Sequence, residues 1–241
     1  MNKNIEKLLN VALNEVGYLE KKSNSQLDDK TANAGYGNFT KYARDMSKCH
    51  PGIYANGYAW CDTFVDWCFV QVFGIVKAKE LIGNWSAYTP TSAENYKNRK
   101  QWYEQPLPGD QIFFYNDKFT EICHTGLVYK VENNIVYTVE GNTSAEAGVI
   151  DNGGGVAKKQ YQLNYARIAG YGRPQYPEEE EEEMAEQVYD WTLACPEWTR
   201  PYVQKALDLG WIQGDENGQL GLTDTKIWCL IVMLRAHNIM E

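Results

Sequence analysis

Cysteine and histidine are both scarce in this sequence of 241 residues, which contains six cysteines and three histidines. No two cysteines are spaced as Cys-x-x-Cys, and this absence argues against a zinc ribbon and against a thioredoxin-like redox site. Six scattered cysteines are also too few for a disulfide framework in a chain of this length. Several of them are therefore expected to be free thiols, as in a protein made in a reducing compartment.

Long apolar runs and a basic tail are missing as well. The N-terminal apolar pattern is interrupted by Asn14 and Glu15, so neither a signal peptide nor a membrane span is expected there. The part after Pro177 holds 14 of the 32 acidic residues but only 4 of the 23 basic ones. Its negative charge argues against nucleic acid as a partner of this part, and the nearly neutral remainder gives no electrostatic reason to assign it a charged partner.

The chain is predicted to have three parts. Six consecutive glutamates, Glu178 to Glu183, repel one another and are typical of a solvated linker. We therefore expect a main domain at 1–176, an acidic linker at 177–188 and a small helical domain at 189–241. A domain of that small size has a marginal core and is expected to need a partner.

Helical patterns precede strand patterns in the main domain. Apolar residues from Ile5 to Val16 recur at helical spacing, whereas apolar and polar residues alternate in the second half. This order predicts an α+β fold with an antiparallel sheet. The expected strands are 111–115, 124–131, 135–140 and 166–172.

One cysteine stands at the start of an apolar helix. An aromatic, turn-like segment leads to Cys61, the apolar stripe begins at Phe64, and the helix is expected to end at Gly74. Unpaired N–H groups and the positive end of the helix dipole favour a thiolate at Cys61, and the thiolate is the nucleophilic form. The alternative role is a small buried side chain, because free cysteine is among the most buried residue types.

His124 is the histidine that the strand pattern places opposite other polar side chains. A three-residue turn at 132–134 would put Gly126 opposite Glu140 and His124 opposite Asn142, and a two-residue turn would shift this pairing by one. In either register these polar groups meet at one end of a hairpin. A nucleophile, an imidazole base and a group that orients the imidazole are the parts of a cysteine-protease-like site. The alternative is a strand-end histidine beside ordinary turn residues.

Four segments that carry these residues resemble the CHAP domain, the cysteine- and histidine-dependent amidohydrolase/peptidase. The resemblance extends from Ile5 to Gln175 and implies a papain-like α+β fold. The segments are Trp60-Cys61-Asp62-Thr63-Phe64-Val65-x-Trp67, Pro108-Gly109-Asp110-x-x-x-Phe114, His124-Thr125-Gly126-x-Val128 and Glu140-Gly141-Asn142.

The resemblance also implies a reaction and a set of roles. CHAP domains cut amide bonds of bacterial peptidoglycan and are common in phage and prophage endolysins. It implies Cys61 as nucleophile, His124 as base and Glu140 as the residue that orients His124, with Asn142 as a further polar group of the site. The bond cut would be the N-acetylmuramoyl-L-alanine amide or a peptide bond of the stem or cross-bridge, as for an endopeptidase.

Substrate contacts, cofactors and location follow from the neighbours of Cys61 together with the same resemblance. Tyr58 and Trp60 flank Cys61 and are expected to contact the substrate. No cofactor and no metal are expected, because the acidic calcium-binding loop of some relatives is not evident and Asp28-Asp29 is read as part of a solvated loop. We expect cytoplasmic accumulation with release to the cell wall by a holin-type route, or an extracellular protein.

The tail resembles the first part of an S-layer homology repeat, a module that anchors proteins to the cell wall. The resemblance rests on Trp198 and on the run Leu209-Gly210-Trp211-Ile212-x-Gly214-Asp215. The usual Thr-Arg-Glu-Glu signature is replaced by Thr223-Asp224-Thr225-Lys226, and a single copy is present. The tail is therefore expected either to bind the cell wall or to mediate homo-oligomerisation, which would multiply weak binding.

Two other functions stay open at this point. One is a wall-binding protein whose CHAP-like domain is inactive, and the other is an intracellular papain-like cysteine protease. Preferential alkylation of Cys61 over Cys68 would argue against the inactive domain. Release of amino groups from purified peptidoglycan would argue against the intracellular protease.

Overall fold

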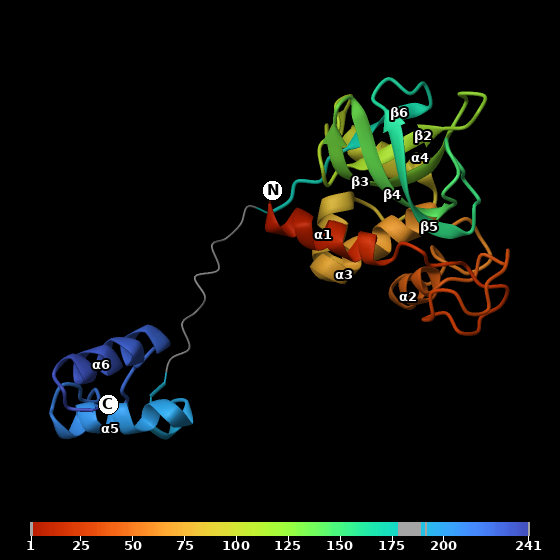
Figure 1. Ribbon diagram of the computed structural model, residues 1–241. Helices are drawn as coiled ribbons and strands as arrows, with labels where there is room; N and C mark the ends of the chain where they lie inside the picture. Colours follow the sequence, from red (N-terminus) through yellow and green to blue (C-terminus); the bar gives the residue numbers. More distant parts are fainter. Residues whose placement is uncertain (1, 178–188, 191, 241) are drawn as a thin grey trace. The chain divides into compact units, whose positions relative to one another are not determined.

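The structure is a computed structural model that describes residues 2–177, 189–190 and 192–240. The chain divides into two units, Met1–Glu178 and Glu179–Glu241 (Figure 1). The predicted acidic linker at 177–188 lies outside the described residues, except for Pro177.

Helices precede strands in the N-terminal unit, and the predicted α+β class is confirmed. The sheet is antiparallel throughout, in the order β1-β6-β2-β3-β4-β5. The helices are α1 (Lys3–Asn14), α2 (Lys41–Cys49), α3 (Cys61–Ile82) and α4 (Thr89–Asn98). The strands are β1 (Trp102–Tyr103), β2 (Gln111–Tyr115), β3 (Ile122–Glu132), β4 (Ile135–Thr143), β5 (Gly155–Gln162) and β6 (Ile168–Gly172).

Strand β5 is absent from the predicted strands because a lysine occupies one of its inward positions. Ala157, Lys159 and Tyr161 alternate on the buried side, while Lys158 and Gln160 are exposed. The Lys159 ammonium donates hydrogen bonds to backbone carbonyl oxygens of the loop that precedes the strand. A buried but hydrogen-bonded lysine hides the alternation of apolar and polar residues from which strands are predicted.

Helix α3 is broken where the sequence predicts its end. Gly74 has the non-helical angles φ 70° and ψ 169°, but a second helical segment continues to Ile82. Ala78, Leu81 and Ile82 of that segment are buried. The predicted end is therefore right for the first segment only, and burial of the second segment explains why the helix resumes.

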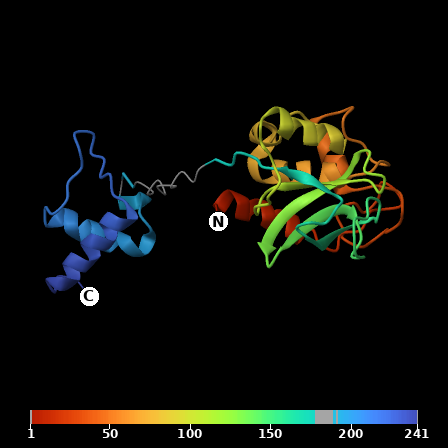
Figure 2. The ribbon, with the colours of Figure 1, turned by 90° about the horizontal axis from the view of Figure 1, so that it is seen from above.

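The start of α3 is held against the middle of the sheet. Figure 2 shows α3 and α4 on one face of the sheet, and Phe64 and Cys68 of α3 pack with Leu127 of β3 and Val139 of β4. Burying one such apolar side chain stabilises the fold by about 1.5–3 kcal/mol. A Cβ atom at Gly141 of β4 would lie 2.6 Å from the Phe64 Cβ atom, so glycine permits this close approach.

The C-terminal unit contains η1 (Thr192–Ala194), η2 (Glu197–Thr199), α5 (Arg200–Asp208) and α6 (Asp224–Ala236). The Thr223 hydroxyl accepts a hydrogen bond from the Lys226 N–H and caps α6. Thr199 precedes α5, but its hydroxyl donates to the Pro196 carbonyl instead of capping the helix. In the part of the chain that the structure describes, no helix has both the length and the apolar character needed to cross a membrane.

Candidate active site

Cys61 is the first residue of α3 and is 5% exposed. The residue before it, Trp60, makes no side-chain capping hydrogen bond to the helix. The sulfur therefore lies where uncapped N–H groups and the helix dipole favour a negative charge. Cys68, two turns further along, is fully buried, and burial raises the pKa of its thiol well above the usual value. Of these two thiols, Cys61 is the one placed to react.

His124 and Glu140 form a fully buried pair. The distance from His124 Nε2 to Glu140 Oε2 is 2.9 Å. Among the described residues, the other ring nitrogen, Nδ1, has no hydrogen-bond partner of good geometry. Burial by itself lowers the pKa of His124, but the Cys61 thiol and the Glu140 carboxylate outweigh it and raise the pKa to about 10. The structure therefore brings these three residues together and favours the imidazolium form.

Two further side chains hold the Glu140 carboxylate. Thr138 Oγ1 donates to its Oε1 atom at 2.5 Å, and the Tyr161 hydroxyl donates to its Oε2 atom at 3.2 Å. These contacts leave Oε2 facing His124. Sequence reasoning missed both. Thr138 could have been found, because residues two apart in a strand share a face, whereas Tyr161 lies on the unpredicted strand β5.

The β3–β4 hairpin reaches the predicted pairing by an unpredicted route. Its turn has two residues, 133–134, both with positive φ, so the predicted three-residue turn is wrong. A register shift between Val128 and Lys130 adds the missing residue back. Beyond this bulge, Leu127 pairs with Val139, which is the predicted register. The shorter turn and the bulge cancel each other, so the polar residues lie at the end of the hairpin where the sequence predicts them.

Gly126 makes room for the carboxylate that faces His124. A Cβ atom there would lie 2.4 Å from Glu140 Cγ. We expect Gly126→Ala to cost about 1–3 kcal/mol through overpacking and to displace Glu140. Thermal unfolding checks the first effect and the pH dependence of activity the second. Gly155→Ala is the matched control, since an added Cβ would meet no atom closer than 3.3 Å. Equal melting temperatures for both variants would contradict this account.

Asn142 is buried but is engaged elsewhere. Its Nδ2 atom donates to the Asp151 carbonyl at 3.3 Å, and its backbone has a positive φ of 55°. Within the described residues, its Oδ1 atom has no hydrogen-bond partner. The pairing that placed Asn142 opposite His124 is not part of the β3–β4 ladder. The structure therefore orients the imidazole through Glu140 and gives Asn142 no bond to it.

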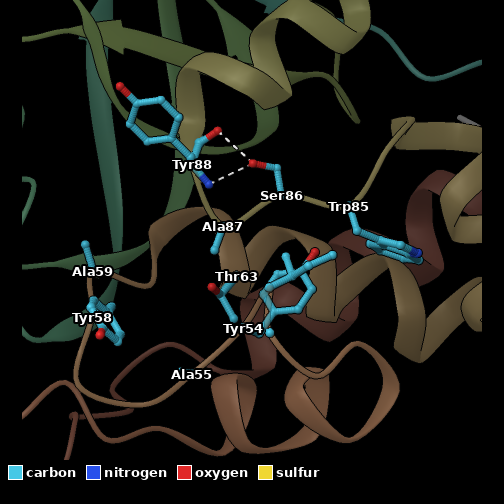
Figure 3. A pocket seen from close by; sticks show the side chains of 11 residues that line it. Tyr54, Ala55, Tyr58, Ala59, Thr63, Trp85, Ser86, Ala87 and Tyr88 are labelled. Carbon is cyan, nitrogen blue, oxygen red and sulfur yellow. Dashed lines mark hydrogen bonds between the residues drawn. The ribbon is translucent and has the colours of Figure 1, made fainter.

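A pocket of about 560 Å³ opens beside the start of α3 (Figure 3). Ala59 and Thr63, which flank Cys61 in the chain, both line it. Tyr58 is 71% exposed and lies at one side of the pocket, and Tyr88 lies at another. None of the 11 lining residues is charged. Cys61 and His124 are not among the lining residues, so the pocket borders the thiol only through the chain neighbours of Cys61. Its uncharged lining suits an uncharged part of a ligand.

Trp60 does not line this pocket. Its side chain is 1% exposed, and its Nε1 atom donates to Glu20 Oε2 at 2.9 Å. Its ring packs on Tyr18 and Tyr42. The expected contact between Trp60 and the substrate is therefore corrected: a large aromatic side chain at the start of α3 gains more from burial in the core, with its N–H paired.

The described residues contain no group of three or more His, Cys, Asp or Glu side chains placed to hold a metal ion. The two adjacent aspartates of the N-terminal loop have other partners. Asp28 accepts two hydrogen bonds of 2.7 Å from Arg44, and Asp29 accepts from the backbone N–H groups of Thr31 and Ala32.

Comparison with protein-family models finds a CHAP domain at residues 53–142. This stretch includes Cys61, His124, Glu140 and Asn142, and it points to the cysteine-dependent amidohydrolases and peptidases. The comparison with curated proteins finds no match.

The solved structures that are similar to the chain include the following two. One is Ly7917, with 9% identity and a TM-score of 0.41, over 70% of this chain and 62% of that one. The other is a protein similar to a lipoprotein of the NLP/P60 family from Staphylococcus aureus subsp. aureus Mu50. It has 13% identity and a TM-score of 0.34, over 73% of this chain and 43% of that one. The chain thus spans less than two thirds of either structure.

Proposed function

We propose that the N-terminal unit is a peptidoglycan hydrolase that cleaves an amide bond of the bacterial cell wall, as an N-acetylmuramoyl-L-alanine amidase or an endopeptidase. The observation that carries this proposal is the buried His124–Glu140 pair beside the thiol at the start of α3, within the CHAP match. Cys61 is the nucleophile, His124 the acid and base, and Glu140 the orienting group.

The arrangement supports a two-step mechanism. The Cys61 thiolate attacks the carbonyl carbon of the amide, and the N–H groups of the first turn of α3 stabilise the oxyanion. The His124 imidazolium gives its proton to the leaving amine, which departs and leaves a thioester on the sulfur. His124, now neutral, takes a proton from a water molecule, which attacks the thioester and releases the acid. Glu140 keeps the imidazole in one orientation through both steps.

The pocket beside Cys61 is proposed to bind an uncharged portion of the wall, with Tyr58 as a contact. We expect Tyr58→Ala to raise KM about three- to tenfold with kcat unchanged, because an exposed ring contributes about 0.5–1.5 kcal/mol of uniform binding. Steady-state kinetics on solubilised peptidoglycan measure this. Phe119→Ala, an exposed ring that does not line the pocket, is the control. A fall in kcat with unchanged KM would contradict the assigned role.

We also propose a division of labour along the chain. Residues 1–176 form the catalytic domain, 177–188 a linker and 189–241 an S-layer-homology-like module that binds the wall or mediates oligomerisation. Trp198 and Trp228 support a binding role, because both are about half exposed and their ring centroids lie 5.3 Å apart. A phage-lysin context, with holin-type release or an extracellular location, belongs to the same proposal.

Digestion of purified peptidoglycan tests the function. Hydrolysis of an amide bond releases one amino group per cut, and mass spectrometry of the muropeptides identifies the bond. Glycan chains freed of stem peptides would assign an amidase, and shortened stems or opened cross-bridges would assign an endopeptidase. No release of amino groups, with protein substrates cleaved instead, would favour the intracellular protease.

A further inference from the structure

A single buried amide connects the neighbours of the two reactive residues. Asp62 follows Cys61 in α3, and Thr125 follows His124 in β3. The Nε2 atom of Gln111, the first residue of β2, donates to Asp62 Oδ1 at 3.1 Å and to Thr125 Oγ1 at 3.1 Å. Asp62, Gln111 and Thr125 are each at most 1% exposed. One side chain therefore links the helix of the thiol to the strand of the imidazole.

The surrounding hydrogen bonds allow only one orientation of this amide. Thr125 Oγ1 donates to the Ile112 carbonyl at 2.7 Å, so toward Gln111 it can only accept. Gln111 Oε1 accepts from the Tyr96 hydroxyl at 3.1 Å. Both N–H groups and the carbonyl oxygen of the Gln111 side chain are thus used. Fully satisfied polar networks of this kind hold the elements that they join in one geometry.

The network contacts the chain neighbours of Cys61 and His124, not the two reactive side chains themselves. Thr125 pairs with Phe113 across β2 and β3, and Phe113 packs against α4 on the helix side of the sheet. His124 pairs with Phe114, and its ring stacks on the Phe114 ring. Because successive strand residues face opposite ways, Thr125 acts on His124 through the backbone.

We propose that Gln111 is a positioning residue for the thiol–imidazole pair, an inference that rests on the proposed function. Its amide ties Asp62 of α3 to Thr125 of β3. Since these two residues adjoin Cys61 and His124, the tie sets the separation between the sulfur and the imidazole ring. A misplacement of about 1 Å in a catalytic group costs about 10²-fold in rate.

Asp62 supplies the conservative variant. Its Oδ2 atom accepts from Ser92 Oγ at 2.6 Å. Burial raises the pKa of Asp62 to about 7, although the hydrogen bonds from Ser92 and Gln111 oppose this. In Asp62→Asn, the amide oxygen accepts from Gln111 and the amide nitrogen donates to Ser92. The hydrogen bond from Gln111 to position 62 is kept, although position 62 no longer ionises. This variant is therefore expected to keep kcat within about threefold of the original protein.

The experiment compares Gln111→Leu and Thr125→Val with Asp62→Asn and with Tyr42→Phe. The last removes a buried hydrogen bond of 2.7 Å to Glu15 in the same unit, away from the tie. Three quantities are measured: kcat and KM on peptidoglycan, the melting temperature, and the pH dependence of Cys61 alkylation by iodoacetamide, resolved by mass spectrometry.

We expect Gln111→Leu to lower kcat about 10²-fold with KM within about twofold. We also expect iodoacetamide to alkylate Cys61 of this variant more slowly across the pH range, because a displaced imidazole activates the thiol less. Thr125→Val should show the same changes to a smaller degree. Tyr42→Phe should lower the melting temperature and leave both the kcat and the alkylation profile in place.

The proposal is overturned if Gln111→Leu and Thr125→Val lower the melting temperature as Tyr42→Phe does but leave kcat and the alkylation profile unchanged. If Gln111→Leu does not fold, Thr125→Val, which loses a single hydroxyl, decides the outcome. Alkylation needs no substrate. Slower alkylation of Cys61 in a protein that does not cleave peptidoglycan would therefore reject the proposed function and still support the positioning role.

Discussion

Cys61→Ala is expected to reduce amide cleavage of purified peptidoglycan below detection while the fold persists. Alanine cannot form the thioester, and removing the nucleophile of such a triad costs on the order of 10⁶-fold in kcat. Little stability should be lost, because the side chain is small and lies at the end of a helix, not in the middle of the core. Release of amino groups measures the activity, and circular dichroism with thermal unfolding measures the fold.

Cys68→Ala is the matched control for this substitution. It removes a thiol from the same helix, but one that is buried in the apolar core. The expected result is a lower melting temperature with nearly unchanged kcat for the folded protein. Full activity of Cys61→Ala, or loss of activity in folded Cys68→Ala, would refute the assignment of Cys61 as nucleophile.

His124→Ala is the substitution with the next largest expected effect. Without the imidazole, the thiolate loses its cationic partner and the leaving amine loses its proton donor. General acid–base catalysis contributes about 10²–10⁴-fold, and kcat should fall at least that far. His237→Ala is the control, because His237 lies in the C-terminal unit, where its ring contacts Trp211. An active His124→Ala protein would contradict the mechanism.

The pH dependence of activity tests the same pair. With a pKa of about 10, His124 stays protonated through neutral pH, and kcat/KM should decline as the pH approaches that value. Glu140→Gln removes one cause of the raised pKa, so its alkaline limb should move to lower pH. The raised pKa of His124 also contributes to the free energy of unfolding. This contribution is fully present below the unfolded-state pKa of 6.5 and is lost as the pH rises through the folded-state value of about 10. An alkaline limb that does not move in Glu140→Gln would argue against this coupling.

Local patterns predicted the parts of the site that depend on neighbours in the chain. Helical spacing from Phe64 onward placed Cys61 in the first turn of a helix, which is α3, and strand alternation located β2, β3, β4 and β6 with errors only at strand ends. These patterns hold because one face of each element is buried. The hairpin register was right near Glu140 although its turn was wrong, because a β-bulge compensated for the shorter turn.

Contacts between distant segments could not be predicted in this way. Tyr161 reaches Glu140 from a strand whose inward lysine conceals it, and Trp60 turns into the core because Glu20, 40 positions earlier, accepts its N–H. Neither contact has a periodic signal, since each depends on how separate elements pack.

By itself, the sequence determined the class of the fold, the helix start that holds Cys61 and the strand end that holds His124, because hydrophobic periodicity and chain neighbours specify them. Only the tertiary structure showed which of the two polar groups at the hairpin end bonds to the imidazole. Glu140 is selected over Asn142, and Gln111 joins α3 to β3, because buried polar groups pair with whatever donor or acceptor the packing brings within about 3 Å.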